Sequence, residues 1–389
     1  MSQGAPDKAA RAISRLARAH VANQNAVARA GGVPLLVGLL EESEAANRAL
    51  RRQEGTADHP NALEAVDAES FLSSCASELG SLGQEEPIDA TGGATPWLRA
   101  DLEHRRRAAT PPAGERRVVI GSAQKEIAGA IWSMSVDNPV NQVSVAEAGG
   151  IPPLVEMLRV HPAGFRDAAG ALWALGADVD NRQAIAECDA EAHSHTSVCI
   201  LPCDAASNAH SWTRVLRVWC SCDGIRPLVA VLRARGPMAI EAHETAAGAI
   251  GILAQTPSNR SLIANAGGIG PLVETFNFGS PETRQQASSA LLTLALQNEA
   301  NQLTIAAGLV RILTHGAPDA QEQACDLTRK LSIDPENRGA LAKVQSIPQL
   351  VRQLQTGTEA SHAHAAEALS NIALKSAELR VQVIQQHLF

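Results

Sequence analysis

The stretch Asn259–Leu296 reads NRSLIANAGGIGPLVETFNFGSPETRQQASSALLTLAL, and it decides the fold. Its pattern predicts a helix, a glycine turn, a second helix, a proline turn and a third helix. The pair Gly267-Gly268 can take the left-handed conformation that ends a helix. Ser280 and Pro281 supply an N-cap and a first-turn proline for the third helix. A unit of this size cannot bury both faces alone, so we expect neighbouring units to cover it.

The same pattern recurs along the chain. Each copy starts with an asparagine that is followed by Gln or Arg. An apolar residue, alanine, a turn and Leu-Val come after them. The copies start at Asn23, Asn141, Asn181, Asn259, Asn301 and Asn337, which lie 118, 40, 78, 42 and 36 residues apart. A period of about 40 residues is typical of stacked helical repeats. The copy at Asn301 is shortened near Gly308, so we expect its first two helices to be fused or truncated.

The copies NQVSVAEAGGIPPLVEMLRV, from Asn141, and NRGALAKVQSIPQLVRQL, from Asn337, resemble the armadillo repeat family. The resemblance covers most of the chain outside two insertions. It implies an all-α fold, a right-handed superhelix (α-solenoid) of three-helix repeats whose third helices line a concave face. We expect residues 1–40 to form an N-terminal cap and first repeat, with a leading third helix at 8–22. Residues 123–389 would form the main repeat array.

The first insertion spans residues 41–122. Glycine and proline are scattered through it and the repeat landmarks are missing, so we expect it to be mostly disordered, with a helical patch at 61–82. A degenerate repeat hidden in this segment is the alternative. Its basic cluster, Arg105–Arg107 with Arg116 and Arg117, is interpreted as a solvated loop.

The second insertion, residues 189–222, interrupts the repeat that starts at Asn181. The expected continuation DGIRPLVAVL follows only at Asp223. Thiolate and imidazole groups at short spacing can complete a zinc site, and this segment is rich in both. The candidate ligands are Cys199, Cys203, Cys220 and Cys222, with Cys188, His193, His195 and His210 nearby. Paired Cys-x-x-Cys knuckles are missing, so we expect an inserted segment without metal, and a zinc site is the alternative.

Composition limits the classes of function. The chain has 389 residues, a formal charge of −8, 45% hydrophobic residues and no tyrosine. A nucleic-acid-binding protein would normally carry a basic stripe, so we expect no nucleic-acid partner. No run of 18 apolar residues is present, so we expect no membrane insertion. The N-terminus lacks a signal-peptide core, which favours a cytoplasmic and possibly nuclear protein.

Sequence motifs of catalysis are absent. The chain contains no GxxxxGK phosphate loop, no GxSxG elbow and no HExxH motif, so we expect neither an enzyme nor a cofactor. Gly129, Gly170 and Gly248 instead recur at one position of the third helix. Glycine costs about 1 kcal/mol in a helix relative to alanine, so these residues indicate close helix packing or room for a ligand segment.

The resemblance also implies where a partner would bind. Family members that bind extended peptides place an asparagine on the third helix in an ALSNIA-type motif, which occurs here once, around Asn371. The equivalent positions hold Arg15, Ser133, Ala174, Ile252, Thr293 and Lys330, a departure that argues against binding of nuclear import signals. Trp132 and Trp173 precede this position in adjacent repeats. Tryptophan is enriched at binding hot spots, but each ring could equally pack between helices.

These observations predict a monomeric scaffold or adaptor that binds an extended or helical segment of another protein along the concave groove. The predicted partner-binding residues are Trp132, Ser133, Trp173, Ala174, Ile252, Thr293, Lys330 and Asn371. Two alternatives remain open at this point: a substrate-recognition subunit for a ubiquitin ligase, and a vacuolar-membrane or cytoskeletal adaptor.

Overall fold

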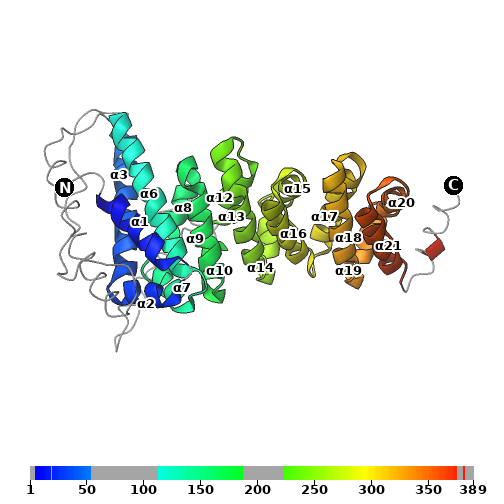
Figure 1. The fold of residues 1–389 in the computed structure, drawn as a ribbon, viewed down its shortest axis with the longest axis horizontal. Coiled ribbons are helices and arrows are strands. Elements are labelled where there is room, and N and C mark those ends of the chain that lie inside the picture. Colours follow the sequence, from blue (N-terminus) through cyan, green and yellow to red (C-terminus); the bar gives the residue numbers. More distant parts are fainter. Residues whose placement is uncertain (1–4, 19, 54–112, 187–222, 375–379, 382–389) are drawn as a thin grey trace, which may run out of the picture. The chain divides into compact units, whose positions relative to one another are not determined.

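The computed structural model describes residues 5–18, 20–53, 113–186, 223–374 and 380–381 (Figure 1). Within these ranges the chain is helical and has no strand, which confirms the predicted all-α fold. None of these helices has the length and apolar character that crossing a bilayer requires. The chain divides into two compact units, residues 1–227 and 228–389. Each unit is a solenoid-type stack of helical repeats.

The first unit begins with a single helix, followed by two three-helix repeats and the start of a third. Its elements are α1 (Ala5–Ala17), α2 (Val21–Arg29), α3 (Gly32–Gln53), α6 (Ala113–Ser135), α7 (Pro139–Glu147), α8 (Ile151–Val160), the 3-10 turn η1 (Pro162–Gly164), α9 (Phe165–Leu175) and α10 (Val179–Ala186). Helix α12 (Ile225–Arg233) contains the unit boundary. The third helices of this unit pack on one another in sequence, because α6 packs against α1 on one side and α9 on the other.

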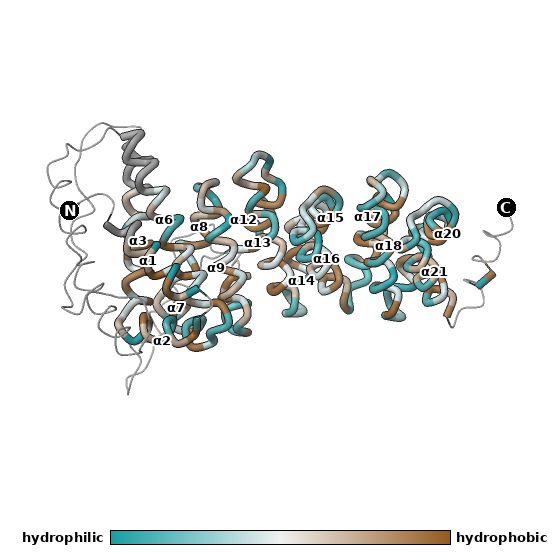
Figure 2. Tube along the Cα trace, viewed as in Figure 1, coloured by the Kyte–Doolittle hydropathy of each residue, from teal (hydrophilic) through white to brown (hydrophobic). Residues whose placement is uncertain are grey.

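The second unit continues the pattern. Its elements are α13 (Pro237–Leu253), α14 (Pro257–Asn265), α15 (Ile269–Phe278), α16 (Pro281–Ala295), α17 (Glu299–His315), α18 (Pro318–Ser332), α19 (Pro335–Lys343), α20 (Ser346–Thr356) and α21 (Glu359–Ala373). Third helix α13 packs on α16, and α18 packs on α21. Polar and apolar residues alternate along the helices, as expected where each helix buries one face (Figure 2).

The quoted stretch folds as its residues predict. Helices α14, α15 and α16 are its three predicted helices, and Gly267 between the first two has φ +71°. The side chain of Ser280 accepts a hydrogen bond from the backbone N–H of Thr283, which makes it the N-cap of α16. The apolar stripe of α16 is fully buried and consists of Ala287, Ala290, Leu291, Leu294 and Ala295.

The shortened copy is confirmed as fused. Helix α17 runs without a break from Glu299 to His315 and takes the place of the first two helices of its repeat. Gly308 lies at the middle of α17, where a Cβ atom would come within 2.9 Å of Val273 on α15. Glycine at this position therefore lets the fused helix approach its neighbour.

Three predicted boundaries differ from the structure. Helix α3 continues to Gln53 and α6 begins at Ala113, so both extend into the range 41–122 that the sequence assigned to an insertion. Residues 41–53 contain neither glycine nor proline, so nothing in them ends the helix. The leading helix ends at Ala17 rather than at residue 22, because His20 is extended and its side chain caps α2. Arg116 and Arg117, which were expected in a solvated loop, belong to helix α6. The helical patch at 61–82, Arg105–Arg107 and the cysteine-rich segment lie outside the described residues.

The asparagine that opens each repeat is buried. In five of the six copies, all except that at Asn337, its side-chain amide donates a hydrogen bond to a carbonyl at the end of the preceding third helix, where the backbone has no helical partner. The donor–acceptor distances are 2.8 Å for Asn23–Leu16, 2.8 Å for Asn141–Met134, 3.1 Å for Asn181–Leu175, 3.1 Å for Asn259–Leu253 and 2.9 Å for Asn301–Leu294. Two of these amides also reach the first helix of the preceding repeat, Asn181 at Gln142 O and Asn301 at Arg260 O.

The residue after the opening asparagine has a longer side chain, which also donates hydrogen bonds to the ends of third helices. Gln142 and Gln302 each donate to a carbonyl seven residues earlier, at 2.9 Å, in the last turn of the preceding third helix. Arg260 does both: its Nε donates to the carbonyl of Ala254 at the end of the preceding third helix, at 3.0 Å, and its Nη1 donates to the carbonyl of Leu296 at the end of the following third helix, at 2.9 Å. Gln or Arg at this position therefore satisfies the helix ends that the asparagine leaves unpaired.

We predict that Asn141→Ala lowers the free energy of unfolding by about 1–3 kcal/mol, because the carbonyl of Met134 would be left buried without a donor. Ser144→Ala is the matched control, since Ser144 lies on the same helix and its hydroxyl bonds only to an exposed carbonyl of that helix. Urea denaturation followed by circular dichroism measures both variants. Equal stabilities for the two variants would contradict this role of the asparagine.

Candidate functional site

The predicted partner-binding residues all lie on third helices, at positions that solvent reaches. In the first unit they are Trp132 and Ser133 on α6 and Trp173 and Ala174 on α9. In the second unit they are Ile252 on α13, Thr293 on α16, Lys330 on α18 and Asn371 on α21. Lys330 is exposed and the others are half-buried. Each unit therefore presents an accessible row on its stacked third helices, which we call the third-helix row.

The polar members of this row bond within the stack. The hydroxyl of Ser133 lies 2.9 Å from that of Ser14 on α1 and also donates to the carbonyl of Gly129. The hydroxyl of Thr293 donates to the carbonyl of Ser289 in its own helix. The amide nitrogen of Asn371 donates to Ser332 Oγ at 3.1 Å. The row therefore offers no repeated set of free side-chain amides to hold a peptide backbone.

Lys330 belongs to a charged cluster in the second unit. Its Nζ lies 2.7 Å from Asp326 Oδ2, and Arg329 contacts the same carboxylate at 2.6 Å and Glu367 at 3.4 Å. The positive charge of Lys330 is therefore largely balanced within the fold.

Trp132 packs on the glycine of the neighbouring third helix. A Cβ atom at Gly170 would lie 2.5 Å from Cδ2 of the Trp132 ring. The glycine thus makes room for the indole, and close packing explains its presence in the helix. Trp132 nevertheless stays half-buried rather than buried, so one part of the ring packs and another part remains accessible.

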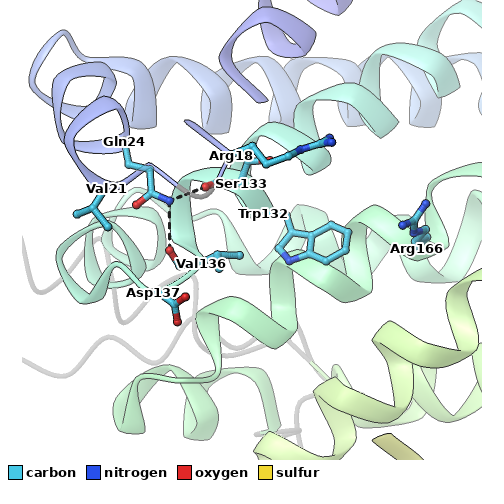
Figure 3. A pocket seen from close by; sticks show the side chains of 8 residues that line it. All are labelled: Arg18, Val21, Gln24, Trp132, Ser133, Val136, Asp137 and Arg166. Carbon is cyan, nitrogen blue, oxygen red and sulfur yellow. Dashed lines mark hydrogen bonds between the residues drawn. The ribbon is translucent and has the colours of Figure 1, made fainter. Parts of the chain in front are cut away.

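The accessible part of Trp132 borders a pocket of about 420 Å³ in the first unit. The pocket lies where α1 and α6 end and where α2 and α9 begin (Figure 3). Its walls are Arg18, Val21, Gln24, Trp132, Ser133, Val136, Asp137 and Arg166. The amide nitrogen of Gln24 donates to the carbonyls of Ser133 and Val136, at 2.9 and 3.2 Å, and this holds α2 against the end of α6.

The pocket contains donors that the fold leaves unused. Arg18 and Arg166 are exposed, and neither guanidinium makes a hydrogen bond within the described parts of the chain. The same holds for the indole N–H of Trp132. Val21, which is 49% exposed, and Val136 add apolar surface beside the ring. The walls therefore combine an aromatic and aliphatic surface with two cationic groups and one carboxylate, that of Asp137.

The sequence alone did not identify Arg18, Val21, Asp137 and Arg166 as site residues. Arg18 lies three residues after Arg15, a helical spacing that places both on the same side of the chain. This spacing could have identified Arg18 as a site residue. Arg166 lies in the first turn of α9. The sequence predicted partner-binding residues only at later positions of the third helices.

A partly buried carboxylate lies next to this pocket. Asp167 in the first turn of α9 faces Gly129, whose Cβ position would be 3.3 Å from its Oδ1. Its Oδ2 is buried and has no hydrogen-bond partner among the described residues. Burial raises the pKa of Asp167 above its ordinary value of 3.8, although Lys125 and Arg166 act in the opposite direction.

The second unit contains a polar pocket of about 390 Å³ away from the third-helix row. It lies between α17 and α19 and is bordered by Glu299 and Lys343, whose charged groups are 2.7 Å apart. The described part of the chain contains no cluster of three or more residues able to hold a metal. The zinc candidates Cys199, Cys203, Cys220 and Cys222 lie outside it. Cys325 is buried, which raises the pKa of its thiol to about 12 and leaves it unreactive.

Comparison with known proteins returns no matching family model and no matching curated protein. Among solved structures, an engineered protein is 20% identical over 65% of this chain and 91% of its own, with a TM-score of 0.44. A designed armadillo repeat protein is 17% identical over 64% and 93%, with a TM-score of 0.43. Another designed armadillo repeat protein, in complex with the peptide (KR)4, gives the same values. Similarity at this level does not establish a family, and the description of the chain as a stack of helical repeats rests on its own three-helix units.

We predict that Gly170→Ala destabilises the first unit, although alanine would gain about 1 kcal/mol in an open helix. The added methyl group would collide with the Trp132 ring. Gly251→Ala is the control, since its Cβ would sit at an ordinary 3.4 Å from Ala290, and we expect it to keep or raise the thermal midpoint. In the Trp132→Ala background, Gly170→Ala should cost less than it does alone. An unchanged cost there would contradict the contact.

We predict opposite pH dependences for two aspartates in first turns. Because the folded-state pKa of Asp167 is raised, its contribution to stability is lost as pH rises from 3.8 through the raised value. Asp167→Asn should therefore gain stability relative to the parent over that interval, by about 1.4 kcal/mol for each unit of pKa difference. A hydrogen bond from Arg284 lowers the pKa of Asp319, so the contribution of Asp319 is lost as pH falls.

Asp319→Asn should accordingly lose stability at neutral pH and approach the parent in acid. Urea titrations at a series of pH values measure both differences in unfolding free energy. Differences that run in the same direction with pH would contradict the assignments.

Proposed function

We propose that this chain is a non-enzymatic scaffold or adaptor that binds a segment of a partner protein along the third-helix row. The observation that carries the proposal is that both tryptophans of the row, Trp132 and Trp173, remain partly accessible on adjacent third helices. The pocket beside Trp132 adds aliphatic surface and unused hydrogen-bond donors. Surfaces that combine a large aromatic side chain with arginine are enriched at protein-binding hot spots.

The composition of the row bears on how a partner would be held. Asn371 is the one asparagine among the predicted partner-binding residues, and its amide nitrogen is already hydrogen-bonded within the fold. Recognition would therefore depend on side-chain pockets of the row rather than on a regular ladder of backbone contacts. An extended or helical segment of the partner fits this mode. The helices are formed before binding, so the partner bears most of the ordering cost.

A displayed library of random peptides, selected on the full chain, tests the proposal. We expect selected peptides whose binding depends on Trp173. Trp173→Ala should weaken it by at least about tenfold, as for a hot-spot aromatic residue. Phe278→Ala is the control, because Phe278 is 78% exposed but lies on second helix α15.

Thermal denaturation of the same variants separates binding from packing. If Trp173→Ala lowers the midpoint and leaves peptide affinity unaltered, the residue has only a packing role. Failure to select any peptide, or equal effects of Trp173→Ala and Phe278→Ala on binding, would contradict the proposal.

A further inference from the structure

The cationic groups around the Trp132 pocket are unusual for this chain, whose formal charge is −8. Arg15 and Arg18 lie about one turn apart at the end of α1, and Arg166 opens the opposite wall from α9. All three are exposed and make no hydrogen bond or ion pair with another described side chain. Arg11, one turn earlier on α1, differs because it pairs with Glu126 at 2.9 Å. Arg18 and Arg166 therefore bring positive charge to the pocket walls that no described side chain pairs, whereas Arg15 does not line the pocket.

We propose that this pocket binds an acidic segment of a partner protein, with an Asp or Glu carboxylate between Arg18 and Arg166 and an adjacent apolar side chain against Trp132. This inference rests on the proposed function and names the chemistry of the partner. Arginine presents a planar fork of donors that matches a carboxylate, and the indole N–H supplies one more donor for a backbone carbonyl.

The charge of the walls favours a carboxylate over a phosphate. Two arginines and Asp137 give the pocket a net charge of +1, which one carboxylate balances. A phosphoryl group carries about −1.5 to −2 at neutral pH, so it would remain partly uncompensated beside Asp137. Asp167 also attracts Arg166, but it leaves that guanidinium without a hydrogen bond, so the donors of Arg166 remain available to a ligand.

The apolar part of the pocket favours a mixed sequence rather than a purely acidic one. Val21, Val136 and the accessible part of Trp132 line the same space as the arginines. A volume of about 420 Å³ exceeds what one carboxylate side chain fills. The pocket therefore suits an acidic residue with an aliphatic or aromatic neighbour.

Fluorescence anisotropy with the full chain tests this inference. The probes are labelled peptides of four Glu-Leu-Gly repeats, with Gln, Lys or phosphoserine in place of Glu in three matched peptides. We expect the Glu peptide to bind at least about tenfold more tightly than the Gln and Lys peptides at low salt, and the preference to shrink as salt increases. The phosphoserine peptide should bind no more tightly than the Glu peptide.

The double variant Arg18→Gln/Arg166→Gln should reduce the preference for Glu over Gln to within about twofold. Arg311→Gln/Arg352→Gln makes the same change in net charge at exposed arginines of α17 and α20, and it should keep the preference. Exposed substitutions of this kind change stability little, and circular dichroism verifies that both variants fold.

Three outcomes would overturn the inference: no binding of the Glu peptide at about 1 mM, tighter binding of the phosphoserine or Lys peptide, or equal effects of the two double variants. If library peptides still depended on Trp173, the chain would bind peptides along the third-helix row, but not through acidic residues at the Trp132 pocket. If no peptide were selected, both the proposed function and this inference would be wrong.

Discussion

The hydrogen bond that joins the opening asparagine of five repeats to the end of the preceding third helix is the constraint on which the rest of the structure depends. A helix ends with carbonyl groups that have no partner in the helix, and a buried helix end must find donors elsewhere. Here the donor is the side chain of the next helix, so one repeat completes the hydrogen bonding of the one before it. Asn181 and Asn301 extend the same bond to the preceding first helix. This explains why a polar residue occupies one of the most buried positions of the repeat.

This arrangement also determines which surface stays open. Once the landmark side chains fix the first helix against the end of a third helix, the third helices pack on each other and keep one side accessible. The contact between Trp132 and Gly170 shows how closely they approach. The same indole then borders the pocket at the junction of α1, α2, α6 and α9. One part of the Trp132 ring therefore packs on Gly170 while another part borders the pocket. A packing role and a binding role for this tryptophan do not exclude each other.

The repeats could be predicted from the sequence because their signals are local. Glycine turns, an N-cap at Ser280 and the asparagine landmark each depend on a few neighbouring residues. The missing residues near Gly308 were enough to predict that the first two helices of that repeat are fused or truncated, and α17 shows that they are fused. The continuation of α3 to Gln53 was not predicted, because repeat alignment ends at the last landmark whereas a helix continues until a residue stops it. The pocket was missed for a different reason. Arg18 and Arg166 are far apart in sequence, and only the packing of α1, α6 and α9 brings them to one cavity.

Hydrogen–deuterium exchange of the full chain, with and without a peptide selected on it, tests most directly whether the third helices form the binding face. We predict that bound peptide slows exchange at the ends of third helices, above all in α6 and α9, and leaves second helices such as α8 and α15 unchanged. Slower exchange confined to the second helices, or no change in any third helix at saturating peptide, would contradict it.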